Sequence, residues 1–177
     1  LLTAPVKGGL KNIVYGVNHD DIQETDKIIG AASCTTNAIV PVLSAIDTKY
    51  TIDNGHVETV HAYTNDQNLI DNYHSKNRRG RAAALNMVLT ETGAASAVSQ
   101  VLPNLNGKIS ANAIRVPTPN VSLAILKLYL EKPSSLEEFN EFLKQTAFHS
   151  LLKDQIDFSI STENVSSDFV GSKYASV

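Results

Sequence analysis

The stretch Ser33-Cys34-Thr35-Thr36-Asn37-Ala38-Ile39-Val40-Pro41-Val42-Leu43 places polar residues directly before an apolar run. Apolar side chains then recur as far as Tyr50, which predicts a largely buried helix. Because proline is best tolerated in the first turn of a helix, Pro41 leads us to expect a start at about Thr36 or Asn37. Residues 56–63 follow with several β-branched side chains, which predicts a strand.

The elements predicted on either side of this unit define the fold class. Residues 64–86 are polar and irregular, and Asn54-Gly55 and Asn106-Gly107 are turn or hairpin signals. The helix over 135–148 carries an apolar stripe, and Ser135 with Glu138 fits a capping box. We therefore expect an α+β domain with a mostly antiparallel sheet and helices on one face. The remaining predicted elements are strands over 13–17, 109–116 and 121–131, the last partly buried on both faces, and a helix over 94–102.

Composition excludes several classes of protein. The chain has 177 residues, of which 42% are hydrophobic and 19% charged, and this content predicts a folded domain, not a disordered segment. One cysteine excludes a disulfide scaffold. No apolar run approaches the ~20 residues that span a bilayer, so we expect no membrane partner. A net charge of −3 gives no reason to expect nucleic acid. Because the first residue is Leu1 and not Met, we expect a piece of a longer protein.

The single cysteine is the first candidate for chemistry. Cys34 stands where a helix begins, and free N–H groups and the helix dipole there favour a thiolate. His61, at the end of the predicted strand, is placed to take the thiol proton. The alternative is a structural role for both residues, with Cys34 as an inert core cysteine and His61 as a core histidine whose hydrogen bonds are all made within the protein. His56 falls on the opposite face of the strand from His61, so we do not expect both in one site. We expect no metal site.

Two further groups of residues are candidates for anion binding. Ser33, Thr35 and Thr36 offer hydroxyls at the first helix start, and Thr92-Gly93 precedes a second one. Arg115 is a charge inside an apolar strand, so it needs either a carboxylate in a structural ion pair or an anionic ligand. We interpret Arg78-Arg79-Gly80-Arg81 as a solvated or interface segment, since the chain is net acidic.

Six short segments of the chain, which include the residues above, together resemble the phosphorylating glyceraldehyde-3-phosphate dehydrogenase family. The resemblance covers essentially the whole chain in the order of the family, and the combination is far more specific than any single block. The matching blocks are Val14–His19, Ala32–Asn37, His61–Gln67, Thr92–Ala95, Arg115–Ser122 and Ser166–Phe169.

The resemblance implies a division of the chain into two parts. Residues 1–33 would be the tail end of an NAD-binding Rossmann domain, and residues 34–177 most of a catalytic domain. The Gly-x-Gly-x-x-Gly fingerprint is absent. We therefore expect the main NAD site to lie outside this chain and the chain to be inactive alone. The sequence leaves NAD or NADP open as the cofactor.

The resemblance also implies roles for individual residues. Cys34 would attack the aldehyde of glyceraldehyde 3-phosphate to form a thiohemiacetal, which hydride transfer to NAD converts to a thioester. Inorganic phosphate would then release 1,3-bisphosphoglycerate, with His61 as the base. The parent enzyme would be a cytoplasmic, glycolytic homotetramer. Thr64, Asp66 and Arg115 would hold the substrate phosphate, and Ser33, Thr35, Thr92 and Gly93 the attacking phosphate.

Three alternatives remain at this point. Erythrose-4-phosphate dehydrogenase shares the cysteine and histidine but lacks the Tyr-Thr-Asn-Asp run that this chain has at residues 63–66. A cysteine hydrolase would use a Cys–His dyad, and the isolated chain could be a structural or assembly module.

The loop over 64–86 resembles the S-shaped loop of the family, which helps form the subunit interface. Residues 68–77 depart from its commonest version and resemble that of a longer bacterial form.

Overall fold

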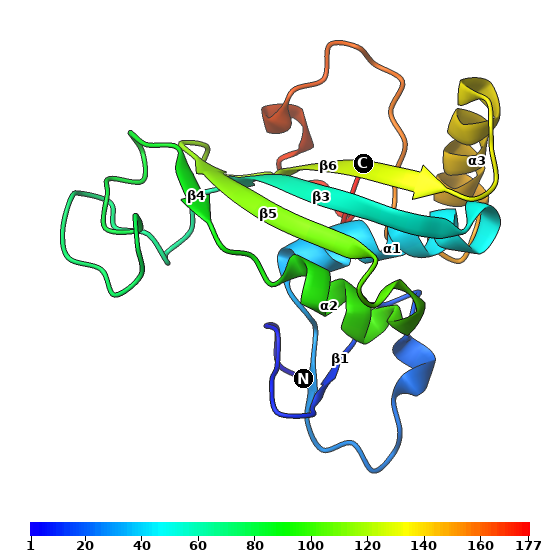
Figure 1. Ribbon diagram of the computed structural model, residues 1–177, viewed down its shortest axis with the longest axis horizontal. Coiled ribbons are helices and arrows are strands. Elements are labelled where there is room, and N and C mark those ends of the chain that lie inside the picture. Colours follow the sequence, from blue (N-terminus) through cyan, green and yellow to red (C-terminus); the bar gives the residue numbers. More distant parts are fainter.

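A four-stranded sheet forms the centre of the computed structural model, which describes residues 1–177 (Figure 1). The strand order is β4-β5-β3-β6. Strand β3 (Ile52–Ala62) pairs in parallel with β5 (Ile109–Val116) and antiparallel with β6 (Leu123–Leu130), while β4 (Val88–Thr90) pairs antiparallel with β5. Two of the three pairings are antiparallel, which confirms the predicted sheet.

Helices cover one face of this sheet. Helices α1 (Cys34–Tyr50) and α2 (Ala94–Val101) run beneath the strands in Figure 1, and α3 (Leu136–His149) stands at one end. Leu43 of α1, Val98 of α2 and Val57 of β3 are fully buried in one core. The rings of Phe139 and Phe142 pack on Tyr50. Apolar burial between sheet and helices therefore holds the domain together, as an α+β fold requires.

The opposite face of the sheet is open. Along β6, alternate side chains are exposed, among them Leu123 and Tyr129, at 59% and 69%. Leu126 and Leu128, on the other face, pack against the core. The prediction that this strand is partly buried on both faces is therefore wrong for this chain. An alternating pattern of exposure is what a strand with one covered face shows.

Helix α1 begins earlier than predicted. Its N-cap is Ser33, whose Oγ accepts a hydrogen bond of 3.1 Å from the Thr36 amide, and Cys34 is the first helical residue. Pro41 consequently lies inside the helix and not in its first turn. The helix tolerates it because its φ is fixed near the helical value, and only one backbone hydrogen bond is lost. The N-cap, and not the proline, determines the start.

Three weaker signals of the sequence differ from the structure. The predicted strand over 13–17 is a turn, in which Asn18 Oδ1 accepts a hydrogen bond of 2.7 Å from the Val14 amide. Nearby, β1 (Lys11–Asn12) pairs with β2 (Ile29–Gly30), and Leu2 forms a bridge with Gly30. Asn54-Gly55 lies within β3 at an irregularity in its pairing with β6 and is not a turn. Asn106-Gly107 forms a turn before β5 and not a hairpin between strands, with Gly107 at a φ of 75°.

The remaining predictions agree well with the structure. Helix α3 begins after Ser135 with both hydrogen bonds of the capping box, and residues 63–87 contain no helix or strand. Short 3-10 helices are found at His19–Asp21, Pro103–Leu105 and Ser166–Phe169. No helix combines the length and apolar character needed to cross a membrane.

Candidate active site

Cys34 occupies the first residue of α1 and is exposed. Its position follows from the cap, because Ser33 turns the chain into the helix directly before it. The pKa of Cys34 is lowered to about 7, first by the hydrogen bond from His61 and further by the charge of His61 and the Thr35 amide, while partial burial opposes the shift. A helix N-terminus that leaves its first amides free favours the anionic form of such a thiol.

His61 lies near the end of β3 and faces the helices. Val57, Thr59 and His61 are every second residue of β3, so their side chains share this buried face, and His61 is only 9% exposed. Its Nε2 is 3.6 Å from Cys34 Sγ, so the structure brings together two residues that are 27 positions apart. His56 lies on the other face, where its ring contacts Ser110 and Asn112, as its place in the strand predicts.

Arg115 is the direct neighbour of His61 across the parallel pair β3–β5. Its Nη1 is 2.6 Å from His61 Nδ1 and 3.0 Å from the Ala62 carbonyl oxygen. It makes no ion pair with a carboxylate, so the structural ion pair that the sequence left open is not formed. Burial lowers the pKa of Arg115, the nearby charge of Arg79 lowers it further, and Cys34 opposes the shift. The cation is therefore available to an anionic ligand.

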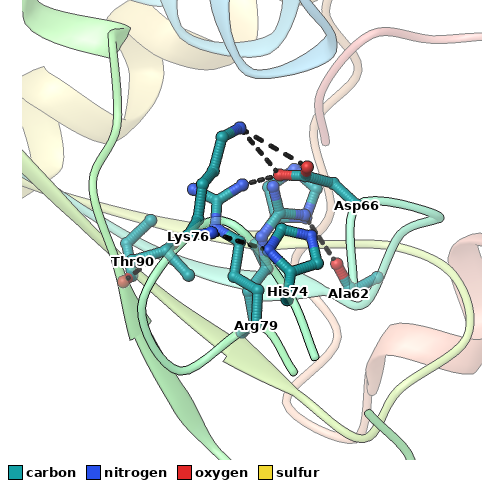
Figure 2. Close-up of polar contacts among 9 residues, drawn as sticks. Ala62, Asp66, His74, Lys76, Arg79 and Thr90 are labelled. Atoms are coloured by element: carbon teal, nitrogen blue, oxygen red, sulfur yellow. Dashed lines mark hydrogen bonds and ion pairs between the residues drawn. The ribbon is translucent and has the colours of Figure 1, made fainter. Parts of the chain in front are cut away.

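Arg79 is the residue that sequence reasoning missed. Its side chain is 12% exposed and forms an ion pair with Asp66, which Lys76 also approaches at 3.4 Å (Figure 2). The other two arginines of the run do meet the expectation of an exposed segment: Arg81 pairs with Asp71 on the surface, and Arg78 donates to the Leu89 carbonyl. Nothing in the spacing distinguishes Arg79 from its neighbours, because the loop is irregular.

The second helix start lies close to the first. Gly93 is the N-cap of α2, and Thr92 Oγ1 accepts a hydrogen bond of 3.2 Å from the Ala94 amide. Ser33, Thr36 and Gly93 line one cavity of about 190 Å³. A Cβ added at Gly93 would meet nothing within 4 Å, so its backbone is accessible. Two helix N-termini facing one cavity make a favourable environment for an anion.

The other predicted site residues make fewer contacts within the chain. Thr64 follows β3 and is exposed, and its hydroxyl has no hydrogen-bond partner in the chain. Thr35 is half-buried in the first turn of α1. No group of three or more His, Cys, Asp or Glu side chains is arranged to hold a metal ion.

A larger cavity adjoins the one at the two helix starts and shares with it the lining residues Val6, Lys7, Asn12 and Gln100. Its volume is about 570 Å³, and it is lined by residues of the N-terminal segment together with Gln100 of α2. Residues 1–33 contain two short strands and no glycine-rich turn from a strand into a helix. They therefore do not fit the phosphate-binding part of a dinucleotide site.

The chain is an α+β domain with a thiol–imidazole pair at a helix start. Residues 33–177 match the family described as "Glyceraldehyde 3-phosphate dehydrogenase, C-terminal domain". The chain belongs to this family.

Relatives along the whole chain agree with this assignment. The chain is 67% identical over 177 residues to a "glyceraldehyde-3-phosphate dehydrogenase-like protein" of Pseudomonas aeruginosa, and 41% identical over its full length to a glyceraldehyde-3-phosphate dehydrogenase of Clostridium pasteurianum. It is 48% identical, over 85% of its length, to the chloroplastic glyceraldehyde-3-phosphate dehydrogenase A of Zea mays. It spans only 38%, 52% and 38% of these three proteins.

Proposed function

We propose that this chain supplies the thiol nucleophile, its base and the phosphate-binding groups of an NAD-dependent glyceraldehyde-3-phosphate dehydrogenase. The single observation that carries the proposal is the pair Cys34 Sγ and His61 Nε2, 3.6 Å apart at the start of α1. Family membership supports the choice of a dehydrogenase over a cysteine hydrolase.

The first chemical step follows from this pair. The pKa of Cys34, about 7, leaves a large share of thiolate at neutral pH. The sulfur attacks the carbonyl carbon of the aldehyde, the C=O π bond breaks, and the thiol proton goes to His61. The carbonyl oxygen becomes the oxyanion of a thiohemiacetal, beside the free amide of Cys34 at the helix N-terminus.

Two groups of residues bind the anions that the reaction needs. Arg115 is the cation closest to the pair, and with Thr64 and Asp66 it is proposed to hold the phosphate of the substrate. Arg79 adds a second positive charge near Arg115. Ser33, Thr35, Thr92 and Gly93 are proposed to hold the attacking phosphate at the two helix starts. A net acidic protein can bind phosphate in this way because the charges are local.

The hydride acceptor is the part that these residues do not provide. Residues 1–33 do not fit a dinucleotide site, so the chain's own chemistry extends to the thiohemiacetal and to the binding of phosphate. NAD, bound elsewhere in the protein, is the acceptor proposed from family membership. A homotetramer is proposed on the same ground, and the exposed apolar side chains of β6 are consistent with subunit contact.

The experiment is a substrate assay on the product of the complete reading frame. NADH formation should require both glyceraldehyde 3-phosphate and inorganic phosphate, and should be lost in Cys34→Ala. His61→Gln should lower kcat by ~10²-fold or more, the usual contribution of a general base. His56→Gln is the matched control, because it changes a histidine of the same strand on the opposite face, and should keep full activity.

Several outcomes would overturn the proposal. A higher kcat/KM for erythrose 4-phosphate would assign the substrate of the sister enzyme. Thioester hydrolysis by Cys34 with no dependence on NAD would assign a hydrolase. The 177-residue chain alone should produce no NADH, and measurable turnover by it would show that the cofactor site lies within these residues.

A further inference from the structure

The loop over residues 63–87 places a carboxylate among the cations of the proposed substrate phosphate site. Asp66 forms an ion pair with Arg79, and Lys76 Nζ lies 3.4 Å and 3.5 Å from its two carboxylate oxygens (Figure 2). An ionised carboxylate has no proton to donate, and its charge repels a phosphate group. Asp66 therefore contributes to phosphate binding only through the two cations with which it pairs.

The two cations that share Asp66 differ in burial. The side chain of Arg79 is 12% exposed, whereas that of Lys76 is 58% exposed. The pKa of Arg115 is lowered by burial and then by the charge of Arg79, so the two guanidinium groups are close enough to repel each other. A guanidinium can offer two parallel N–H groups to a phosphate. Arg79 is therefore the inner cation, suited to a ligand beside Arg115, and Lys76 is the outer one.

The charges of this cluster match a phosphate monoester. Arg115, Arg79 and Lys76 each carry one positive charge, and Asp66 carries one negative charge. The thiol–imidazole pair adds no net charge, whether its proton lies on sulfur or on nitrogen. The cluster is therefore doubly positive, and a phosphate monoester carries a charge of about −1.5 to −2 near pH 7. Without Lys76 the cluster would be only singly positive.

We propose that Lys76 is a positioning residue for Arg79 and that it acts through Asp66. In the free protein Asp66 is shared by both cations. When a phosphate monoester binds beside Arg115, Arg79 turns its guanidinium to the phosphate, and Lys76 keeps Asp66 paired. The exchange avoids the cost of leaving a half-buried carboxylate without a partner. With glutamine at position 76, Asp66 would have Arg79 as its single cationic partner and would hold it back from the ligand.

This inference deepens the proposed function, on which it rests for the identity of the substrate. It assigns Lys76 to the phosphate that the substrate carries, and not to the attacking phosphate at the two helix starts. An aldehyde without a phosphate group should therefore be indifferent to Lys76. No covalent bond changes in the exchange, since ion pairs alone are made and broken.

The experiment is calorimetric titration of the product of the complete reading frame with glycerol 3-phosphate, which has the phosphate monoester but no aldehyde. Lys76→Gln should weaken binding about three- to fivefold, the size expected for an exposed ion pair. Lys76→Arg keeps the charge and should bind as wild type. Lys144→Gln is the matched control, because Lys144 also lies beside a carboxylate, that of Glu141 on α3, at the end of the sheet away from the loop (Figure 1). It should bind as wild type.

A double-mutant cycle tests whether Lys76 acts through Asp66. In an Asp66→Asn background, Lys76→Gln should change the affinity less than about twofold, because the carboxylate through which it acts is gone. In the enzyme assay, Lys76→Gln should raise KM for glyceraldehyde 3-phosphate by the factor seen in the titration. It should leave kcat, KM for inorganic phosphate, and kcat/KM for unphosphorylated glyceraldehyde unchanged.

Each result supports or overturns the inference. No binding of glycerol 3-phosphate by the wild type, an unchanged affinity in Lys76→Gln, or an equal loss in Lys144→Gln overturns it. A full loss in the Asp66→Asn background would mean that Lys76 contacts the phosphate directly, which overturns action through Asp66. The titration uses neither aldehyde nor NAD. An inactive enzyme that gives the expected titrations would therefore refute the proposed function alone, and an active enzyme with an unaltered Lys76→Gln would refute the inference alone.

Discussion

The junction of α1 and β3 and the loop over residues 63–87 both contribute to the candidate site, but they do so in different ways. Cys34 and His61 are placed by a helix cap and by strand alternation, and the elements behind them are buried. Arg79 and Asp66 are placed by side-chain contacts within a segment that has no helix or strand. The reactive pair is therefore held by elements of the core, whereas Arg79 and Asp66 are held by polar contacts of the loop.

This difference between the two regions predicts which substitutions lower the stability of the protein most. Buried apolar contacts behind the pair should dominate stability, while the loop should tolerate substitution and act mainly on anion binding. Each of the following experiments changes the same type of residue in both regions.

The largest effect is expected in the core. Leu43 in α1 is fully buried, whereas Leu69 in the loop is 73% exposed. Leu43→Ala should lower the free energy of unfolding by about 3 kcal/mol, because it removes buried methyl groups and leaves a cavity. Leu69→Ala should change it by less than about 0.5 kcal/mol. Urea denaturation of both variants measures this, and equal losses would show that the loop is part of the core.

The next effect concerns the thiol. Removing the hydrogen bond and charge of His61 in His61→Gln should raise the pKa of Cys34 from about 7 towards the ordinary value. At pH 7 the thiolate fraction then falls roughly 15-fold, since free cysteine titrates at about 8.5. Thiolate absorbance as a function of pH measures the shift.

His74→Gln is the control for this titration, because His74 belongs to the loop and contacts the Lys76 amide. In wild type and control the thiolate should be present above about pH 7 and lost as the pH falls below it. An unshifted curve in His61→Gln would mean that the helix N-terminus alone lowers the pKa of Cys34.

The smallest effect is expected at the helix cap. Ser33→Ala removes the acceptor for the Thr36 amide and should cost about 1 kcal/mol of stability. Ser75→Ala in the loop removes an exposed hydroxyl that makes no hydrogen bond, and should be neutral. Thermal unfolding compares the two. A neutral Ser33→Ala would indicate that another group caps α1.

The sequence identified the regular parts of the site well. A polar cluster before an apolar run predicted a helix that starts just after Cys34, at about Thr36 or Asn37, and β-branched residues predicted the strand that ends near His61. It failed where one local signal had to be weighed against another. Pro41 pointed to a later helix start, although the Ser33 cap prevails, and the apolar run over 13–17 lacks a partner strand and folds into a turn around Asn18.

The sequence by itself determined which reactive groups this protein has and on which elements they lie, because caps and strand alternation are local properties of the chain. Only the tertiary structure decided that Arg115 lies against His61, since this depends on the register between two strands that are far apart in sequence. The tertiary structure also selected Arg79 from three similar arginines and left one face of β6 open. Long-range pairing and burial determine these features, and no local pattern encodes them.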